Sequence, residues 1–316
     1  MRPTIAVTRW IPDEALEVLA QAGEVKLSDA DRPLMPEELR DHVAGASAVV
    51  SMLHDRVDGS LAEAGGPGLK VVANVAVGYD NVDVAVLAAR GVTVTNTPGV
   101  LTDATADLAF GLLLAVTRRL GEGERLIRAR TPWSFHLGFL LGSGLQGKTL
   151  GIVGPGQIGR AVARRAAAFG LRTVYSGRSA KPGLEGEFLP FEELLRQSDF
   201  VSLHCPLTPE TRHLIDARAL QTMKPGAYLV NTTRGLVVDE SALADALEAG
   251  EIAGAALDVF EAEPEIEPRL LGREDVVLTP HLGSATVETR TAMAVLAARN
   301  VTSVLTGGQP LTEVRP

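Results

Sequence analysis

Three polar segments in the second half of the chain each follow a short apolar run typical of a buried strand. The segments are 231–235, 258–264 and 280–284. Ligands of parallel sheets lie beyond the carboxyl ends of the strands, so we expect all three segments to face one ligand. They carry Arg234, Glu263 and His281, which together can bind an anion and transfer a proton. Each residue alone is compatible with a structural role, as a strand cap, a turn residue or a buried histidine, but the combination favours catalysis.

A glycine motif precedes these segments. Residues 154–159 read Gly-Pro-Gly-Gln-Ile-Gly, between an apolar run and an alanine-rich stretch, which is the strand-turn-helix setting of a dinucleotide fingerprint. Gly154 allows a tight turn, Gly156 lets the backbone approach phosphates, and Gly159 lets the helix pack close to the strand. The alternative is a glycine-rich loop without a ligand. The flanking patterns favour a site for a pyrophosphate at the start of the helix.

The strand after this motif indicates which dinucleotide binds. NAD proteins place an acidic residue about twenty positions after the fingerprint, where it accepts hydrogen bonds from the adenosine ribose. Here residues 171–179 end without a carboxylate, and Ser176 occupies the position of the acidic residue. Arg178 and Ser179 follow it and suit a 2'-phosphate. We therefore predict a preference for NADP(H), with NAD(H) possible; the alternative is that Arg178 is an ordinary solvated arginine.

Composition narrows the class of protein. The chain has 316 residues, 46% of them hydrophobic and 22% charged, with a net charge of -9, which argues against nucleic acid or an anionic membrane as a partner. A single cysteine, Cys205, excludes an intramolecular disulfide, and the absence of a Cys/His cluster predicts no metal site. The N-terminus reads directly as a strand without a signal peptide, and no apolar stretch reaches the length of a membrane span. We predict a cytoplasmic protein.

Two series of apolar runs alternate with amphipathic stretches, which predicts an α/β fold with parallel sheets. The expected strands are 5–7, 48–51, 71–74 and 92–95 in the first series, and 150–153, 173–176, 200–203, 227–231, 255–259 and 276–278 in the second. We expect two Rossmann-like, doubly wound domains with a cleft between them. Because the final helix, from about 288, follows the last strand of the second series, we infer that it returns to the first domain. The predicted domains are 1–97 plus 288–316, which binds substrate, and 98–287, which binds the dinucleotide.

Several separated motifs in this order resemble the NAD(P)-dependent D-2-hydroxyacid dehydrogenase family. They are 77–83 (Val-Gly-Tyr-Asp-Asn-Val-Asp), the glycine motif, 204–211 (His-Cys-Pro-Leu-Thr-Pro-Glu-Thr) and the three polar segments. The likeness covers nearly the whole chain. Within the family, residues 176–178 and 280–286 are most similar to glyoxylate/hydroxypyruvate reductases. The resemblance implies reduction of a small 2-keto acid and a dimer formed through the nucleotide domain.

The resemblance gives the candidate catalytic residues specific roles. Arg234 binds the substrate carboxylate and polarises the neighbouring carbonyl, because its planar fork matches a carboxylate. His281 is the proton donor, and Glu263 accepts a hydrogen bond from the other imidazole nitrogen and fixes the tautomer. The backbone amides of Val77 and Gly78 resemble the carboxylate clamp of the family. Closure of the two domains is then expected to exclude water.

The resemblance also implies a set of cofactor-binding residues. They are Leu101, Thr105, Gly154, Gly156, Gln157, Ile158, Gly159, Ser176, Arg178, Ser179, His204, Cys205, Pro206, Thr211, Thr232, Thr233, Asp258, His281 and Gly283. Asp258 is expected to bind the nicotinamide carboxamide, the alternative being a strand-end residue that caps local amides. Phe139 departs from the indole side chain expected in the most similar reductases, and Trp133 lies near enough in sequence to compensate.

These observations predict NADPH-preferring reduction of glyoxylate or hydroxypyruvate to the D-2-hydroxy acid. One alternative is NAD-dependent oxidation of another D-2-hydroxy acid, of the phosphoglycerate or lactate type. Another is a non-catalytic, nucleotide-sensing protein similar to the corepressors that resemble this family. The expected partners are a small anionic substrate and a second copy of the chain.

Overall fold

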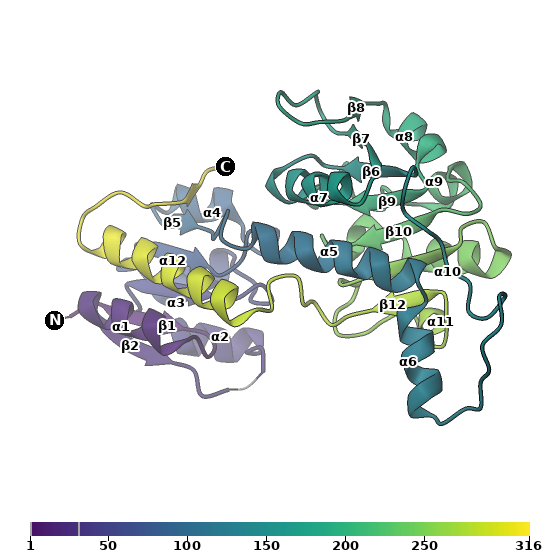
Figure 1. Cartoon of the computed structure of the whole chain (residues 1–316). Coiled ribbons are helices and arrows are strands. Elements are labelled where there is room, and N and C mark those ends of the chain that lie inside the picture. The colour runs from purple at the N-terminus through teal and green to yellow at the C-terminus, as the bar shows by residue number, and fades with distance from the viewer. Residues whose placement is uncertain (1, 31) are drawn as a thin grey trace. The chain divides into compact units, whose positions relative to one another are not determined.

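The computed structural model describes residues 2–30 and 32–316. The chain divides into two compact units. Unit 1 contains the residues up to Leu101 together with Ala285–Pro316, and unit 2 is Thr102–Ser284. Each unit contains one sheet with helices on both faces, so the predicted α/β class is confirmed (Figure 1).

Unit 1 is built on a six-stranded sheet in the order β13-β5-β4-β3-β1-β2, parallel except for the pairing of β13 with β5. Its strands are β1 (Thr4–Val7), β2 (Glu24–Leu27), β3 (Ala48–Ser51), β4 (Val71–Asn74), β5 (Thr93–Thr95) and β13 (Glu313–Val314). Its helices are α1 (Asp13–Ala22), α2 (Pro36–Val43), α3 (Gly59–Gly65), α4 (Val84–Ala89) and α12 (Val287–Leu305). Helix α12 packs against α1 and β4, so the last helix completes the core of this unit.

Unit 2 is built on a seven-stranded parallel sheet in the order β12-β11-β10-β9-β6-β7-β8. Its strands are β6 (Thr149–Val153), β7 (Arg172–Ser176), β8 (Glu187–Phe188), β9 (Phe200–Leu203), β10 (Tyr228–Asn231), β11 (Gly254–Leu257) and β12 (Val276–Leu278). Its helices are α5 (Thr102–Thr117), α6 (Leu120–Arg128), α7 (Gln157–Ala168), α8 (Phe191–Gln197), α9 (Ala217–Thr222), η1 (Gly235–Val237), α10 (Glu240–Ala249) and α11 (Pro268–Leu271). The chain runs outward from β6 to β8 and returns to β9, so the strand order reverses between β6 and β9. Ligands of doubly wound sheets bind at such a reversal.

Both faces of the unit 2 sheet are buried. Alternate residues of the strands pack into two cores, one under α5 and α7 and the other under α8, α9 and α10. Ile152 of β6 belongs to the first core and Val153 to the second, as the alternation of side chains along a strand requires. Polar side chains of this sheet can therefore meet a ligand only at the strand ends. None of the helices within the described residues is long and apolar enough to span a membrane.

Candidate active site

The glycine turn after β6 has the geometry of a phosphate site. Gly154 has a φ of +90°, and a Cβ there would lie 2.5 Å from the backbone nitrogen of Cys205. A Cβ on Gly159 would lie 2.6 Å from the carbonyl oxygen of Gly154, whereas a Cβ on Gly156 would meet nothing within 4 Å. The space beside Gly156 is therefore open while the other two glycines are packed.

Helix α7 begins directly after this turn, and Gly156 is its N-cap residue. The first turn has no acidic residue, and Gly156 offers no side chain to cap its amides. These amides include those of Gln157 and Ile158, and together with the helix dipole they favour an anion at this point. The open space and the uncapped helix start fit the pyrophosphate of a dinucleotide.

The ends of β9 and β10 carry two buried polar atoms with no hydrogen-bond partner among the residues that the structure describes. They are Nδ1 of His204 and Oγ1 of Thr232. The other ring nitrogen of His204 lies 2.9 Å from Oγ of Ser202, and burial lowers the pKa of His204 to about 4. His204 is therefore neutral at physiological pH. Buried polar groups normally have a partner, so these two atoms fit a polar ligand at the strand reversal.

Cys205 and the loop that follows it also lie at the end of β9. Burial raises the pKa of the Cys205 thiol to about 11, which makes it a small apolar residue and a poor nucleophile. The hydroxyl of Thr211 accepts from the amide of Thr208 at 2.8 Å and donates to the carbonyl of Pro206 at 2.7 Å. Thr211 therefore closes the loop after β9.

The end of β7 lies beside the glycine turn. Ser176, the last residue of β7, pairs with Val153 of β6, and its carbonyl accepts from the amide of Gly154 at 2.9 Å. Arg178 and Ser179 follow on the exposed surface. The structure thus brings Ser176 next to the dinucleotide motif, with an exposed guanidinium two residues further along the chain.

His281 and Glu263 form a hydrogen-bonded pair. Nδ1 of His281 lies 2.9 Å from Oε2 of Glu263, and the side chains are 29% and 20% exposed. The other carboxylate oxygen of Glu263 accepts from the amide of Phe260 at 3.1 Å. Because a carboxylate accepts, Nδ1 of His281 carries a proton, and Nε2 remains the ring nitrogen that is able to exchange a proton with a ligand. His281 has a φ of +54°, a conformation that a non-glycine residue adopts only when its surroundings enforce it.

Asp258 holds His281 in this backbone conformation. Its buried carboxylate accepts from the amides of Leu282 and Gly283 at 2.7 and 2.8 Å and from the hydroxyl of Thr279 at 2.6 Å. Its carbonyl accepts from the amide of His281 at 2.9 Å. Burial raises the pKa of Asp258, and these hydrogen bonds oppose the increase. Asp258 therefore caps local amides and fixes the turn that carries His281, and its contact with a carboxamide stays a prediction.

Arg234 lies on a second loop, which Asn231 holds. The side chain of Asn231 accepts from the amide of Thr233 at 3.1 Å and donates to the carbonyl of Arg234 at 3.0 Å. Arg234 is partly buried, and its Nη1 donates to the carbonyl of Thr233 at 2.9 Å. The next residue, Gly235, packs so closely that a Cβ there would overlap the carbonyl carbon of Phe260. The loops that carry Arg234 and Glu263 are therefore in direct backbone contact.

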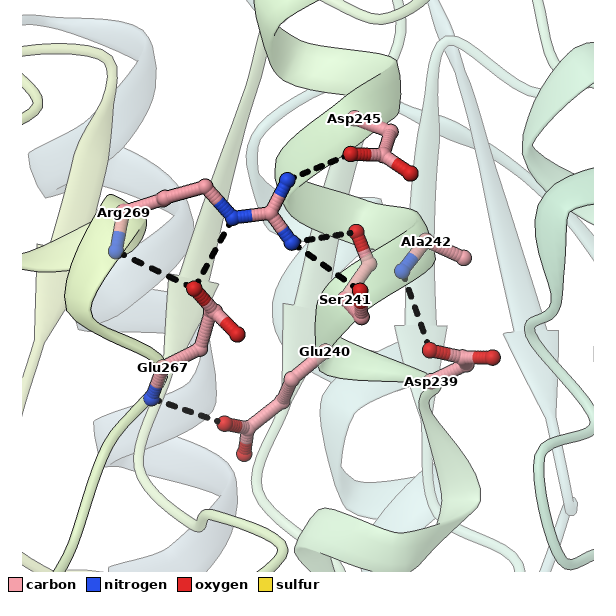
Figure 2. A network of polar contacts seen from close by, with 7 residues as sticks. All are labelled: Asp239, Glu240, Ser241, Ala242, Asp245, Glu267 and Arg269. Atoms are coloured by element: carbon pink, nitrogen blue, oxygen red, sulfur yellow. Dashed lines mark hydrogen bonds and ion pairs between the residues drawn. The ribbon is translucent and has the colours of Figure 1, made fainter.

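A polar network fastens the segment that carries Glu263 to α10. The buried carboxylate of Glu240 accepts from the amides of Glu261 and Glu267 at 2.6 and 3.2 Å, and the Glu240 amide donates to Glu261 at 2.9 Å. Burial raises the pKa of Glu240. Arg269 adds hydrogen bonds to Glu267 and Ser241, both at 2.9 Å, and an ion pair with Asp245 (Figure 2). Both ends of segment 261–267 are thereby tied to one helix.

The sequence predicts no supporting role for Asn231, Gly235 or Glu240. Glu240 follows the helix cap Asp239, which accepts from the amide of Ala242 at 2.9 Å. The pattern at 239–242 therefore indicated only the start of a helix. The glycine that follows Arg234 was the one available signal, because a close approach of two backbones requires glycine.

The other predicted residues lie in both units. Val77 and Gly78 follow β4 in unit 1, where they are partly buried, and Leu101 is a buried residue of the same unit. In unit 2 the buried hydroxyl of Thr105, on α5, donates to the carbonyl of Gly283 at 3.1 Å. Thr105 therefore links this helix to the loop of His281.

Comparisons with known proteins show the family of the chain. Residues 110–283 match the family described as D-isomer specific 2-hydroxyacid dehydrogenase, NAD binding domain. A glyoxylate reductase of Thermococcus litoralis is 47% identical over 98% of this chain and 96% of its own length. A glyoxylate reductase of Pyrococcus furiosus is 47% identical over 99% and 96%.

Solved structures show the same likeness. A protein from Thermus thermophilus has a TM-score of 0.93 and 46% identity, over 98% of this chain and 99% of its own. An NADPH-dependent glyoxylate/hydroxypyruvate reductase from Sinorhizobium meliloti, in complex with NADP and malonate, has a TM-score of 0.87 and 37% identity, over 99% and 97%. The chain therefore belongs to the D-isomer specific 2-hydroxyacid dehydrogenase family, and the predicted resemblance is confirmed.

Proposed function

We propose that this enzyme reduces a small 2-keto acid, glyoxylate or hydroxypyruvate, to the corresponding 2-hydroxy acid with NADPH as the preferred cofactor. The product has the D configuration where it is chiral. The observation that carries the proposal is the hydrogen-bonded pair of His281 and Glu263, which stands on a turn fixed by Asp258. The names of the similar reductases support the choice of substrate.

The roles of the side chains follow from their chemistry. Bound NADPH supplies the hydride that reaches the carbonyl carbon. Arg234 binds the carboxylate and stabilises the negative charge that develops on the carbonyl oxygen. His281 donates the proton from Nε2 to that oxygen, while Glu263 holds Nδ1 and stabilises the imidazolium before the proton is transferred. The backbone amides of Val77 and Gly78 bind the substrate carboxylate.

The residues of the glycine motif, in the turn after β6 and at the start of α7, hold the pyrophosphate. Asp258 contacts the nicotinamide carboxamide. The edge formed by β9 and β10 supplies the other contacts. The residues there are His204, Cys205, Pro206, Thr211, Thr232 and Thr233, with Leu101, Thr105 and Gly283 from the neighbouring segments.

Cofactor preference depends on the end of β7. A 2'-phosphate beside Ser176 and Ser179 pairs with the guanidinium of Arg178, and a hydrogen bond between two charged groups contributes about 1.5–3 kcal/mol. We expect Arg178→Ala to raise KM for NADPH roughly 10- to 100-fold and to change KM for NADH little. Arg218→Ala is the control, because Arg218 is an exposed arginine of the same unit that pairs with Glu192. Equal rises in KM for NADPH and NADH would refute this role of Arg178.

A homodimer is proposed from the exposed apolar residues of unit 2. Helix α6 has no buried residue, and the segment after it carries large exposed side chains. The exposed residues are Leu120, Ile127, Trp133, Phe135, Leu137 and Leu141. Within this segment Trp133 and Phe139 stack with ring centroids 5.8 Å apart. Such a concentration of exposed apolar groups is typical of an interface.

The oligomeric state tests this interface. We expect the wild type to elute from gel filtration at the mass of two chains. The double variant Phe135→Asp/Leu137→Asp is expected to elute at the mass of one chain, because the two carboxylates must lose water when the surface is covered. A single-chain mass for the wild type excludes the dimer.

A further inference from the structure

Two backbone carbonyl groups of the segment that follows β4 accept hydrogen bonds from side-chain amides. Nδ2 of Asn96 donates to the carbonyl of Val77 at 2.8 Å, and Nδ2 of Asn74 donates to the carbonyl of Gly78 at 3.1 Å. In a trans peptide the N–H points away from the C=O of the same unit. By holding the carbonyl of Val77, Asn96 therefore sets the direction of the N–H of Gly78.

The amides of this segment are available for a ligand. No hydrogen bond within the described residues engages the N–H groups of Val77 and Gly78, and both residues are only partly buried. Successive backbone N–H groups with a fixed orientation bind anions. The side chain of Asn74 is itself held, because it exchanges hydrogen bonds of 3.2 Å with Asn81.

Asn96 is in turn fixed by the C-terminal tail of the chain. The hydroxyl of Thr312 donates to the carbonyl of Asn96 at 2.6 Å, and the carbonyl of Thr312 accepts from the amide of Asn96 at 3.3 Å. Asn300, a fully buried residue of α12, donates from Nδ2 to the Thr312 hydroxyl at 2.8 Å. Its Oδ1 accepts from the amides of Leu311 and Thr312 at 2.8 and 3.1 Å. A continuous chain of hydrogen bonds thus runs from α12 through the tail to Val77.

We propose that Asn96 is a positioning residue that orients the Gly78 amide toward the substrate carboxylate, and that Thr312 and Asn300 hold Asn96 in that orientation. This inference rests on the proposed function, in which the amides of Val77 and Gly78 bind the carboxylate. It assigns the C-terminal tail an indirect part in substrate affinity, through Asn96. Asn96 acts on binding of the carboxylate and leaves proton transfer to His281.

The test compares Asn96→Ala with the wild type in steady-state kinetics. We expect KM for glyoxylate to rise about tenfold and kcat to change by less than about threefold, because the lost hydrogen bond orients a binding group. The affinity for NADPH, measured by fluorescence titration, is expected to stay the same. With uncharged methyl glyoxylate, kcat/KM is expected to fall less than with glyoxylate.

Two further variants separate the tail from a general loss of structure. Thr312→Val removes the hydroxyl without a change in size, and we expect a smaller rise in KM of about threefold. Thr306→Val is the matched control, since the hydroxyl of Thr306 donates only within α12 and its C-cap, to the carbonyls of Thr302 and Ser303. It is expected to leave KM unchanged. Equal effects of Thr312→Val and Thr306→Val would overturn the role of the tail.

An unchanged KM for glyoxylate in Asn96→Ala would overturn the role of Asn96, as would an equal fall in kcat/KM for glyoxylate and its methyl ester. A wild-type enzyme that does not oxidise NADPH with glyoxylate would instead contradict the proposed function. The role of Asn96 would then be tested by calorimetric titration of the wild type and Asn96→Ala with oxamate, a stable 2-keto acid analogue. A weaker affinity in Asn96→Ala supports the inference, and equal affinities, or no binding to either protein, overturn it.

Discussion

Replacing His281 with glutamine is expected to lower kcat for glyoxylate reduction about 10²- to 10⁴-fold, the usual contribution of a general acid or base. Glutamine preserves much of the length of the side chain but cannot exchange a proton near neutral pH. The affinity for NADPH is expected to fall much less than kcat, because in the proposed function the glycine motif at the start of α7 holds the pyrophosphate. Stopped-flow absorbance at 340 nm and fluorescence titration measure the two quantities.

Glu263→Gln is the companion variant and is expected to have a smaller effect. Its amide can still accept from Nδ1 of His281, but it brings no negative charge to stabilise an imidazolium. We therefore expect the kcat of Glu263→Gln to lie between those of the wild type and His281→Gln. If His281→Gln kept the wild-type kcat, the role of His281 as proton donor would be refuted. Wild-type protein that binds NADPH without turnover across a panel of 2-keto acids would favour the nucleotide-sensing alternative.

The strands that sequence predicted are those with buried side chains on both faces. Each predicted apolar run overlaps an observed strand, and β3, β4 and β9 are buried along their whole length. The strands that were missed lie at the edges or near the end of the chain. Strand β2 alternates exposed and partly buried residues, and β8 and β13 have two residues each. Such segments lack the apolar run that marks a central strand of a parallel sheet.

Candidate site residues could be predicted where local sequence determines their position. A glycine motif or a polar residue directly after a buried strand is visible within a few positions, and the predictions for Gly154, Arg234 and His281 rest on such patterns. The residues that position these groups depend on contacts far apart in sequence. Asp258 reaches amides 24 and 25 residues further along, and Glu240 reaches amides 21 and 27 residues away. Only the folded structure shows these partners.

The supporting contacts share one physical principle. Each candidate catalytic loop of unit 2 is held by a buried polar side chain that hydrogen-bonds to backbone groups. These side chains are Asn231 for the loop of Arg234, Glu240 for that of Glu263 and Asp258 for that of His281. A buried polar group that loses its partner is costly, so these bonds favour a single loop conformation. These hydrogen bonds therefore help to keep the candidate catalytic side chains in position.

Gly235 joins two of these loops, and Gly235→Ala is expected to be the most disruptive change outside the reacting groups. The added Cβ would overlap the backbone of Phe260 and Glu261, which cannot yield as a flexible side chain can. Overpacking of this kind costs about 3 kcal/mol, which corresponds to a fall in Tm of roughly 6–12 °C. Because the loops of Arg234 and Glu263 must separate to admit the methyl group, we expect kcat to fall about 100-fold.

Gly226→Ala is the matched control for this prediction, since a Cβ at Gly226 meets nothing within 4 Å. It lies in the same unit, just before β10, and is expected to keep both Tm and kcat. Differential scanning fluorimetry and steady-state kinetics with glyoxylate measure the two quantities. If Gly235→Ala lowers Tm but leaves kcat unchanged, the loop contact stabilises the fold without positioning Arg234. If it changes neither, the two backbones can separate at little cost, and the proposed coupling between the loops is wrong.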